Sequence, residues 1–167
     1  MTHPQPLNVL FLCTHNSARS ILAEALLNHL GNGRFKAYSA GSSPRENQQP
    51  NPLGLQVLQH AGIATDGLHS KSWDAFSGPD APHMDLIITV CDNAAGEVCP
   101  VWPGHPATAH WGYADPSEGP GSDAEKLEAF RSTLYAMRRR LELMLSLPAD
   151  KLEKALLQTT ARELAAS

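Results

Sequence analysis

The chain has 167 residues, of which 42% are hydrophobic and 18% charged, as expected for one globular domain with a core of its own. A formal net charge of -4 argues against a general nucleic-acid binder, so any anion site has to be local. No apolar run approaches the roughly 20 residues that cross a bilayer, and residues 1–6 lack the features of a signal peptide. We therefore expect a cytoplasmic protein without nucleic-acid or membrane partners.

The apolar run 7–12 predicts a strand that is buried on both faces, and the amphipathic run 21–30 predicts a helix. Between them lies the segment Cys13-Thr14-His15-Asn16-Ser17-Ala18-Arg19-Ser20. If this loop curls, its backbone N–H groups converge into an anion-binding nest, to which the helix N-terminus adds its positive dipole end. Arg19 can close the nest with a bidentate fork, and the same field favours the thiolate of Cys13. We interpret residues 13–20 as an oxyanion cradle with a nucleophile, not as a structural cysteine near a surface arginine.

Further elements alternate along the chain. Strands are predicted at 35–40, 86–90 and 107–111, and helices at 52–61 after an Asn51 cap, within 70–76, and from a capping box at Ser122 to Leu145. Alternating strands and helices predict an α/β fold with one central parallel four-stranded sheet and helices on both faces. We assign residues 1–147 to this single domain and residues 148–167 to a C-terminal helical extension. Ligands bind at the C-terminal ends of such strands, where Cys13 and Cys91 both lie.

Cys91 and Cys99 flank a segment rich in glycine and alanine with no apolar periodicity. Three cysteines do not form a paired structural framework, and cysteines that pair in a reducing compartment are more often catalytic. Zinc binding with His105 and His110 is one alternative, although the close ligand pairs of structural zinc sites are missing. Two inert core cysteines are another.

The pair Asp115-Pro116 follows the last predicted strand. A carboxylate at this position could reach the cradle and act as a general acid towards a leaving oxygen. An Asp-Pro pair also starts turns, but its place after a strand favours the catalytic interpretation.

These motifs resemble the low-molecular-weight protein tyrosine phosphatase fold: Cys13 and Arg19 separated by five residues, Ser20, and a late Asp115-Pro116. The segments 38–41 and 110–112 and the Cys91/Cys99 loop narrow the resemblance to the thioredoxin-coupled arsenate reductases of that fold. It covers roughly residues 7–145.

The resemblance implies a thiol relay. Cys13 would attack arsenate held by the loop amides and Arg19, and Asp115 would protonate the departing oxygen. Cys91 would then attack Cys13 and release arsenite, and Cys99 would move the disulfide to Cys91–Cys99, where thioredoxin reduces it. Phosphate or sulfate would compete for the cradle, built from Thr14, His15, Asn16, Ser17, Ala18, Arg19 and Ser20, and no cofactor or metal is implied.

The chain departs from this family in three places. The Cys91/Cys99 loop looks one residue longer, and the tail after Pro148 inherits no function. Some relatives bind potassium through residues that match Asn16, Glu24 and Ser39, but the further carboxylate of that site is Ser72 here, which counts against the ion.

Two other functions compete with the reductase. A phosphatase for phosphotyrosine or another phosphomonoester would use the same cradle, but it leaves Cys91 and Cys99 without a role. Ser117, where such phosphatases usually carry an aromatic residue, favours a small inorganic anion.

The other competing function is that of a non-catalytic oxyanion sensor or redox sensor. Two reductants are compatible with these cysteines: thioredoxin suits an internal disulfide, and glutathione with glutaredoxin would need fewer of the cysteines.

Overall fold

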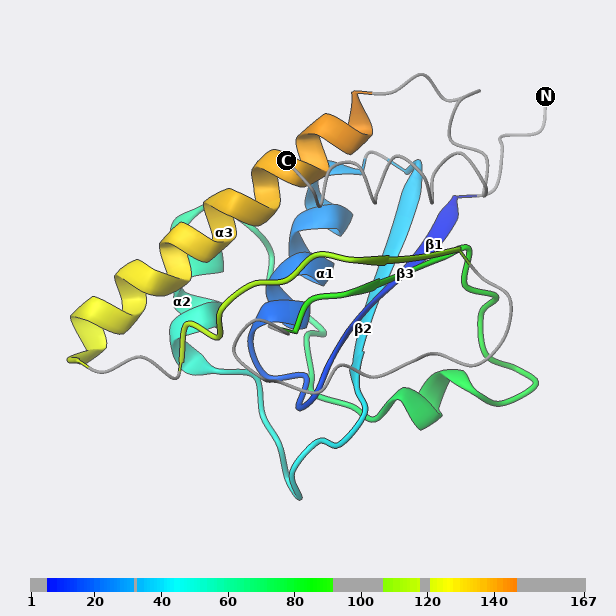
Figure 1. The fold of residues 1–167 in the computed structure, drawn as a ribbon, viewed down its shortest axis with the longest axis horizontal. Helices are drawn as coiled ribbons and strands as arrows, with labels where there is room; N and C mark the ends of the chain where they lie inside the picture. Colours follow the sequence, from blue (N-terminus) through cyan, green and yellow to red (C-terminus); the bar gives the residue numbers. More distant parts are fainter. Residues whose placement is uncertain (1–5, 32, 92–106, 118–120, 147–167) are drawn as a thin grey trace.

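The computed structural model describes residues 6–31, 33–91, 107–117 and 121–146. The elements alternate along the chain as predicted (Figure 1). In order they are β1 (Leu7–Cys13), α1 (Arg19–Leu30), β2 (Phe35–Gly41), α2 (Pro52–His60), the 3-10 helix η1 (Trp73–Phe76), β3 (Leu86–Thr89), β4 (Ala107–His110) and α3 (Asp123–Leu145).

The four strands form one sheet in the order β2-β1-β3-β4, and every neighbouring pair is parallel. Cys13 pairs with Gly41, and Leu12 pairs with Thr89, which in turn pairs with His110. All four C-terminal strand ends therefore lie at one edge of the sheet. The predicted α/β fold with a parallel four-stranded sheet is confirmed.

The two faces of the sheet carry different cores because successive side chains of a strand point to opposite sides. Val9, Phe11 and Cys13 belong to the larger core, which takes in the buried faces of α1, α2 and α3. Leu10 and Leu12 belong to a smaller core that includes Trp73 and Phe76 of η1. Among the described residues, helices thus cover both faces of the sheet. The three α-helices lie on one face, and η1 lies on the other (Figure 1).

Capping residues set most helix boundaries where the sequence predicts them. The Asn51 side chain accepts a hydrogen bond from the Leu53 N–H, and Pro52 opens α2. Ser122 and Glu125 form the predicted capping box of α3. Helix α1 begins at Arg19, two residues before the predicted start, and its first turn therefore belongs to the cradle. Helix α2 ends at His60, one residue before the predicted end, and Ala61 is its exposed C-cap.

Several predictions fall outside the described residues. They are the terminal helix at 150–167, the extension after residue 147, Cys99 and His105. No helix in the described part of the chain is long and apolar enough to cross a membrane.

Candidate active site

The thiol of Cys13 sits at the centre of the loop that joins β1 to α1. Cys13 ends β1 and is only 3% exposed, and its thiol is free. Its sulfur accepts a hydrogen bond from the Asn16 N–H at 3.1 Å and lies 3.0 Å from the Ser20 hydroxyl oxygen. The predicted cradle thus brings its own polar groups to the nucleophile.

Asn16 fixes the shape of this loop. Its backbone is left-handed, with φ of 57°, a conformation that asparagine tolerates better than most residues. Its fully buried side chain donates to Ser20 Oγ at 2.7 Å and accepts from the Lys71 N–H at 2.9 Å. Asn16 therefore ties the cradle to a segment 55 residues further along the chain.

Gly41, at the end of β2, lets the cradle approach the neighbouring strand. A Cβ atom built on it would lie 2.6 Å from the Thr14 carbonyl oxygen and 3.0 Å from the Asn16 nitrogen. The Ser42 and Ser43 N–H groups donate to the carbonyl oxygens of Cys13 and Thr14. The backbone of the cradle thus rests directly on the glycine.

We expect Gly41→Ala to destabilise the protein by about 2 kcal/mol, since overpacking against backbone atoms has no flexible side chain to relieve it. Urea denaturation followed by circular dichroism measures the loss. Gly78→Ala is the matched control, because nothing lies within 4 Å of a Cβ there. Equal stability of the two variants would contradict this close approach.

Arg19 is the cation of the cradle. The residue is 6% exposed at the start of α1, and Nη1 donates to the Tyr113 carbonyl oxygen at 3.0 Å. Nη2 lies 3.6 Å from Asp115 Oδ2. One edge of the guanidinium is thus held by the segment after β4, which orients the group towards the cradle.

Asp115 reaches the same place from the segment after β4. Its Oδ1 accepts from the Ser117 N–H at 2.9 Å and from the Ser117 hydroxyl at 2.7 Å, so Oδ2 is the oxygen that faces Arg19. The structure therefore brings together Cys13 and Arg19 of the cradle and Asp115 of a separate motif at one edge of the sheet.

Cys91 lies two residues past the end of β3, and β3 is the neighbour of β1 in the sheet. It is fully buried and disulfide-bonded, in contrast to the free thiol of Cys13. Within the described residues, no three His, Cys, Asp or Glu side chains gather as metal ligands. Cys99 and His105, two of the four ligands of the zinc alternative, lie outside those residues. His110 Nδ1 instead lies 2.7 Å from the Thr89 hydroxyl.

The segment 110–112 of the family resemblance has a packing role. Trp111 is 1% exposed, and its N–H donates to the Thr89 carbonyl. A Cβ on Gly112 would lie 3.1 Å from His110 Nε2, so the glycine leaves room for the imidazole. This segment extends the pairing of β4 with β3 and leads the chain towards Asp115.

A polar hollow of about 420 Å³ opens beside the cradle. His15 and Ser17 line it from the cradle and Asp115 and Ser117 from the facing segment, while residues 45–52 form the rest. Of the cradle, only His15 and Ser17 line it, and neither Cys13 nor Arg19 does. The hollow therefore lies beside the nucleophile and not around it.

Three residues make contacts at the site that the sequence did not predict, and of these only Ser117 had been singled out, for another reason. Tyr113 holds Arg19 through its carbonyl, Ser117 fixes Asp115, and Lys71 binds Asn16. Burial raises the pKa of the Tyr113 hydroxyl, while Arg140, whose guanidinium lies 5.0 Å from the ring centroid, acts in the opposite sense. Only the place of Tyr113 and Ser117 near Asp115 could have suggested them.

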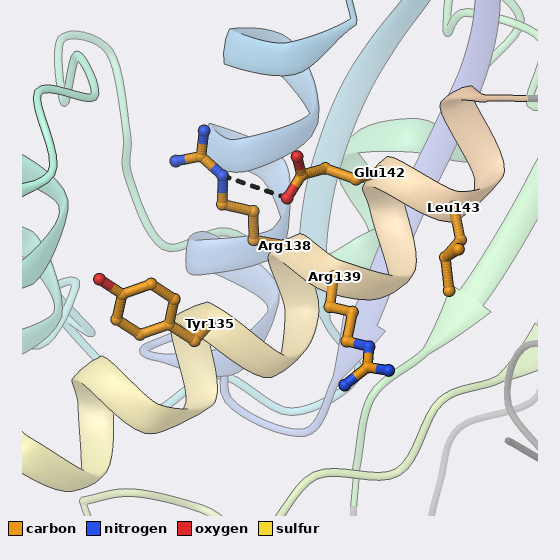
Figure 2. Close-up of a pocket in the computed structure, with 5 residues that line it drawn as sticks. All are labelled: Tyr135, Arg138, Arg139, Glu142 and Leu143. Carbon is orange, nitrogen blue, oxygen red and sulfur yellow. Dashed lines mark ion pairs between the residues drawn. The ribbon is translucent and has the colours of Figure 1, made fainter.

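A second hollow, of about 540 Å³, lies on α3 and is unrelated to the cradle (Figure 2). Tyr135 and Leu143 line it together with Arg138, which pairs with Glu142 at 3.4 Å. An i,i+4 ion pair on an exposed helix face is an ordinary feature of a solvated surface. We assign this second hollow no role in the chemistry.

The fold and site define the class of protein. Residues 8–157 match the family of low molecular weight phosphotyrosine protein phosphatases, and the chain belongs to that family.

Within this family the chain is similar to arsenate reductases. It is 38% identical to the arsenate reductase of Bacillus licheniformis over 136 residues, which are 80% of this chain and 91% of that protein. The crystal structure of arsenate reductase from Archaeoglobus fulgidus superposes with a TM-score of 0.67 at 27% identity, covering 83% of this chain and 99% of that one. A thioredoxin-dependent arsenate reductase of Corynebacterium glutamicum gives a TM-score of 0.53 at 26% identity, over 85% of this chain and 65% of that one.

Proposed function

We propose that this protein is an enzyme that reduces arsenate to arsenite and is reset by thioredoxin. The observation that carries the proposal is the buried Cys91, which follows β3, the strand that pairs with the one ending in the free thiol of Cys13, in a chain similar to arsenate reductases. Phosphate and sulfate, with the same tetrahedral shape, would compete for the cradle.

The first step is the attack of the Cys13 thiolate on arsenic. The N–H groups of residues 14–19 and the Arg19 guanidinium hold the oxyanion, and a sulfur–arsenic bond forms as an oxygen leaves. Asp115 gives its proton to that oxygen, which departs as water. This assignment is supported by the geometry of Asp115: Ser117 holds its Oδ1, so that its Oδ2 lies beside Arg19, 3.6 Å from Nη2.

The second step is the reduction itself. The Cys91 thiolate attacks Cys13 Sγ, a disulfide forms, and the sulfur–arsenic bond breaks with its electron pair left on arsenic. Arsenic leaves as arsenite, reduced by two electrons, and the two thiols are oxidised to one disulfide.

The last steps restore Cys13. The Cys99 thiolate attacks Cys91 Sγ and displaces the Cys13 thiolate, after which the thioredoxin dithiol reduces the Cys91–Cys99 bond. A disulfide at Cys91 together with a free Cys13 is consistent with the protein at the end of this relay. Because Cys91 is fully buried, we infer that thioredoxin attacks the sulfur of Cys99.

The related proposal of a phosphatase rests on the family alone. It needs Cys13, Arg19 and Asp115 but gives no role to the other two cysteines. Ser117 binds Asp115 where an aromatic side chain would grip a substrate ring, which favours an inorganic anion.

The test is arsenate-dependent NADPH consumption in the presence of thioredoxin and thioredoxin reductase. We expect Cys13→Ser and Cys91→Ser to abolish arsenite release, because each removes a bond that the reduction requires. Cys99→Ser should release about one arsenite per chain and then stop, with a Cys13–Cys91 disulfide visible by mass spectrometry.

Full steady-state activity of Cys99→Ser would rule out the relay. Hydrolysis of p-nitrophenyl phosphate that survives loss of both Cys91 and Cys99, without any arsenate reduction by the intact chain, would favour the phosphatase.

We also propose that residues 1–147 form the catalytic domain and that residues 148–167 are an extension. The enzyme works in the cytoplasm, where thioredoxin is reduced.

A further inference from the structure

The side chain of Lys71 enters the interior next to the cradle. Its ammonium donates to the Ser39 carbonyl oxygen at 2.9 Å and lies 3.8 Å from Glu24 Oε1. The Ser39 hydroxyl donates to the same Glu24 oxygen. The side chains of Lys71 and Glu24 are each only 15% exposed.

The backbone of Lys71 also contacts the cradle. Its N–H donates to Asn16 Oδ1 at 2.9 Å, and its carbonyl accepts from the Gly41 N–H at 2.9 Å. Asn16 in turn donates to Ser20 Oγ, which lies 3.0 Å from Cys13 Sγ. Lys71 thus joins a partly buried ion pair to the chain of hydrogen bonds that ends at Cys13.

A bound monovalent cation does not fit beside these groups. The oxygens that could hold it, Glu24 Oε1 and the Ser39 carbonyl, are the atoms that the Lys71 ammonium already contacts. Two cations in this partly buried space would repel each other strongly. Ser72, next in the chain, adds no carboxylate and instead caps η1 by accepting from the Asp74 N–H.

Burial lowers the pKa of Lys71, and the carboxylate of Glu24 opposes that effect. The carboxylate needs a positive partner, because a buried unpaired charge is costly and would repel an anion in the cradle. Lys71 is the cation that the described residues place against it.

We propose that the Lys71 ammonium is a built-in cation that takes the place of a bound monovalent metal ion, positions the Asn16–Ser20–Cys13 hydrogen bonds, and makes oxyanion binding independent of potassium. Lys71 is a positioning residue, since its contacts are to Glu24, Ser39 and Asn16. The proposal rests on the proposed function only in taking residues 13–20 as the oxyanion site.

The test uses inorganic phosphate as the probe, with binding measured by calorimetry on the full chain reduced by a non-thiol reductant. We expect Lys71→Met to weaken phosphate binding roughly tenfold, because the Glu24 charge is then uncompensated near the anion. Alkylation of Cys13 by iodoacetamide at neutral pH, in a Cys91→Ser/Cys99→Ser background, should slow in parallel. Lys36→Met is the matched control, since Lys36 is an exposed lysine of β2 that lies over the Tyr38 ring.

Cation dependence separates this role from simple packing. Exchange of sodium for potassium at constant ionic strength should change phosphate binding of the parent less than twofold. Lys71→Ala leaves a space beside Glu24. In this variant, ammonium or potassium ions should restore most of the lost affinity for phosphate without changing its thermal stability. The proposal is overturned if Lys71→Met behaves like Lys36→Met, if the parent responds severalfold to potassium, or if no cation restores Lys71→Ala. None of these readouts requires arsenate reduction, so failure here and failure of the proposed reductase are distinguishable.

Discussion

Replacing Arg19 with lysine should lower kcat/KM for arsenate by about 10²–10³-fold, the usual loss when a preorganised donor to a developing anion is removed. The guanidinium uses one nitrogen to hold the Tyr113 carbonyl and presents its other face to the cradle and Asp115. An ammonium keeps the charge but cannot make both contacts, because it lacks the rigid fork. Steady-state assays with thioredoxin and its reductase measure the loss, and phosphate calorimetry should show weaker binding in the same variant.

Arg34→Lys is the matched control for this substitution. Arg34 also donates through Nη1 to a carbonyl, that of Leu145, but it precedes β2 and so lies at the opposite edge of the sheet. Both variants lose a guanidinium that is tied to a backbone oxygen. If they lose activity equally, the guanidinium of Arg19 acts through stability and not through the anion.

The parts of the site that sequence could predict are those encoded locally. Cys13, Asn16 and Arg19 stand in one short loop between an apolar strand and a helix, so the periodicity of the neighbours fixes the kind of structure around them. Parallel pairing then places the residues after β1, β3 and β4 at one edge, which is why Asp115 and Cys91 could be assigned to the same region.

The remaining parts depend on contacts between distant segments that no local pattern encodes. The Lys71 N–H meets Asn16 across 55 residues, and Tyr113 meets Arg19 across 94. Both contacts use backbone atoms, which every residue type carries. Arg140 is the last of three consecutive arginines, a pattern typical of a solvent-exposed helix face. Its guanidinium nevertheless packs over the Tyr113 ring, because α3 and Tyr113 belong to the same core.

Substituting Asp115 with asparagine should separate catalysis from binding. We expect kcat for arsenate reduction to fall by about 10²–10³-fold, within the range that general acids contribute, because the departing oxygen then has no proton donor. Phosphate binding should stay nearly unchanged, since the Tyr113 carbonyl still holds Nη1 of Arg19 when the carboxylate beside Nη2 is replaced by an amide. Steady-state kinetics and calorimetry on the same preparation give the two numbers.

The contrast between the two numbers identifies the role. A carboxylate that served only to orient Arg19 would lose binding together with turnover on substitution, because a loose guanidinium holds the anion poorly. A proton donor loses turnover alone. Asp85→Asn is the control, since Asp85 accepts the Asn8 N–H at 2.8 Å just before β3 and so lies at the far edge of the sheet. Weaker phosphate binding in Asp115→Asn, matched to the fall in kcat, would assign Asp115 to the support of Arg19 and leave the proton to another group.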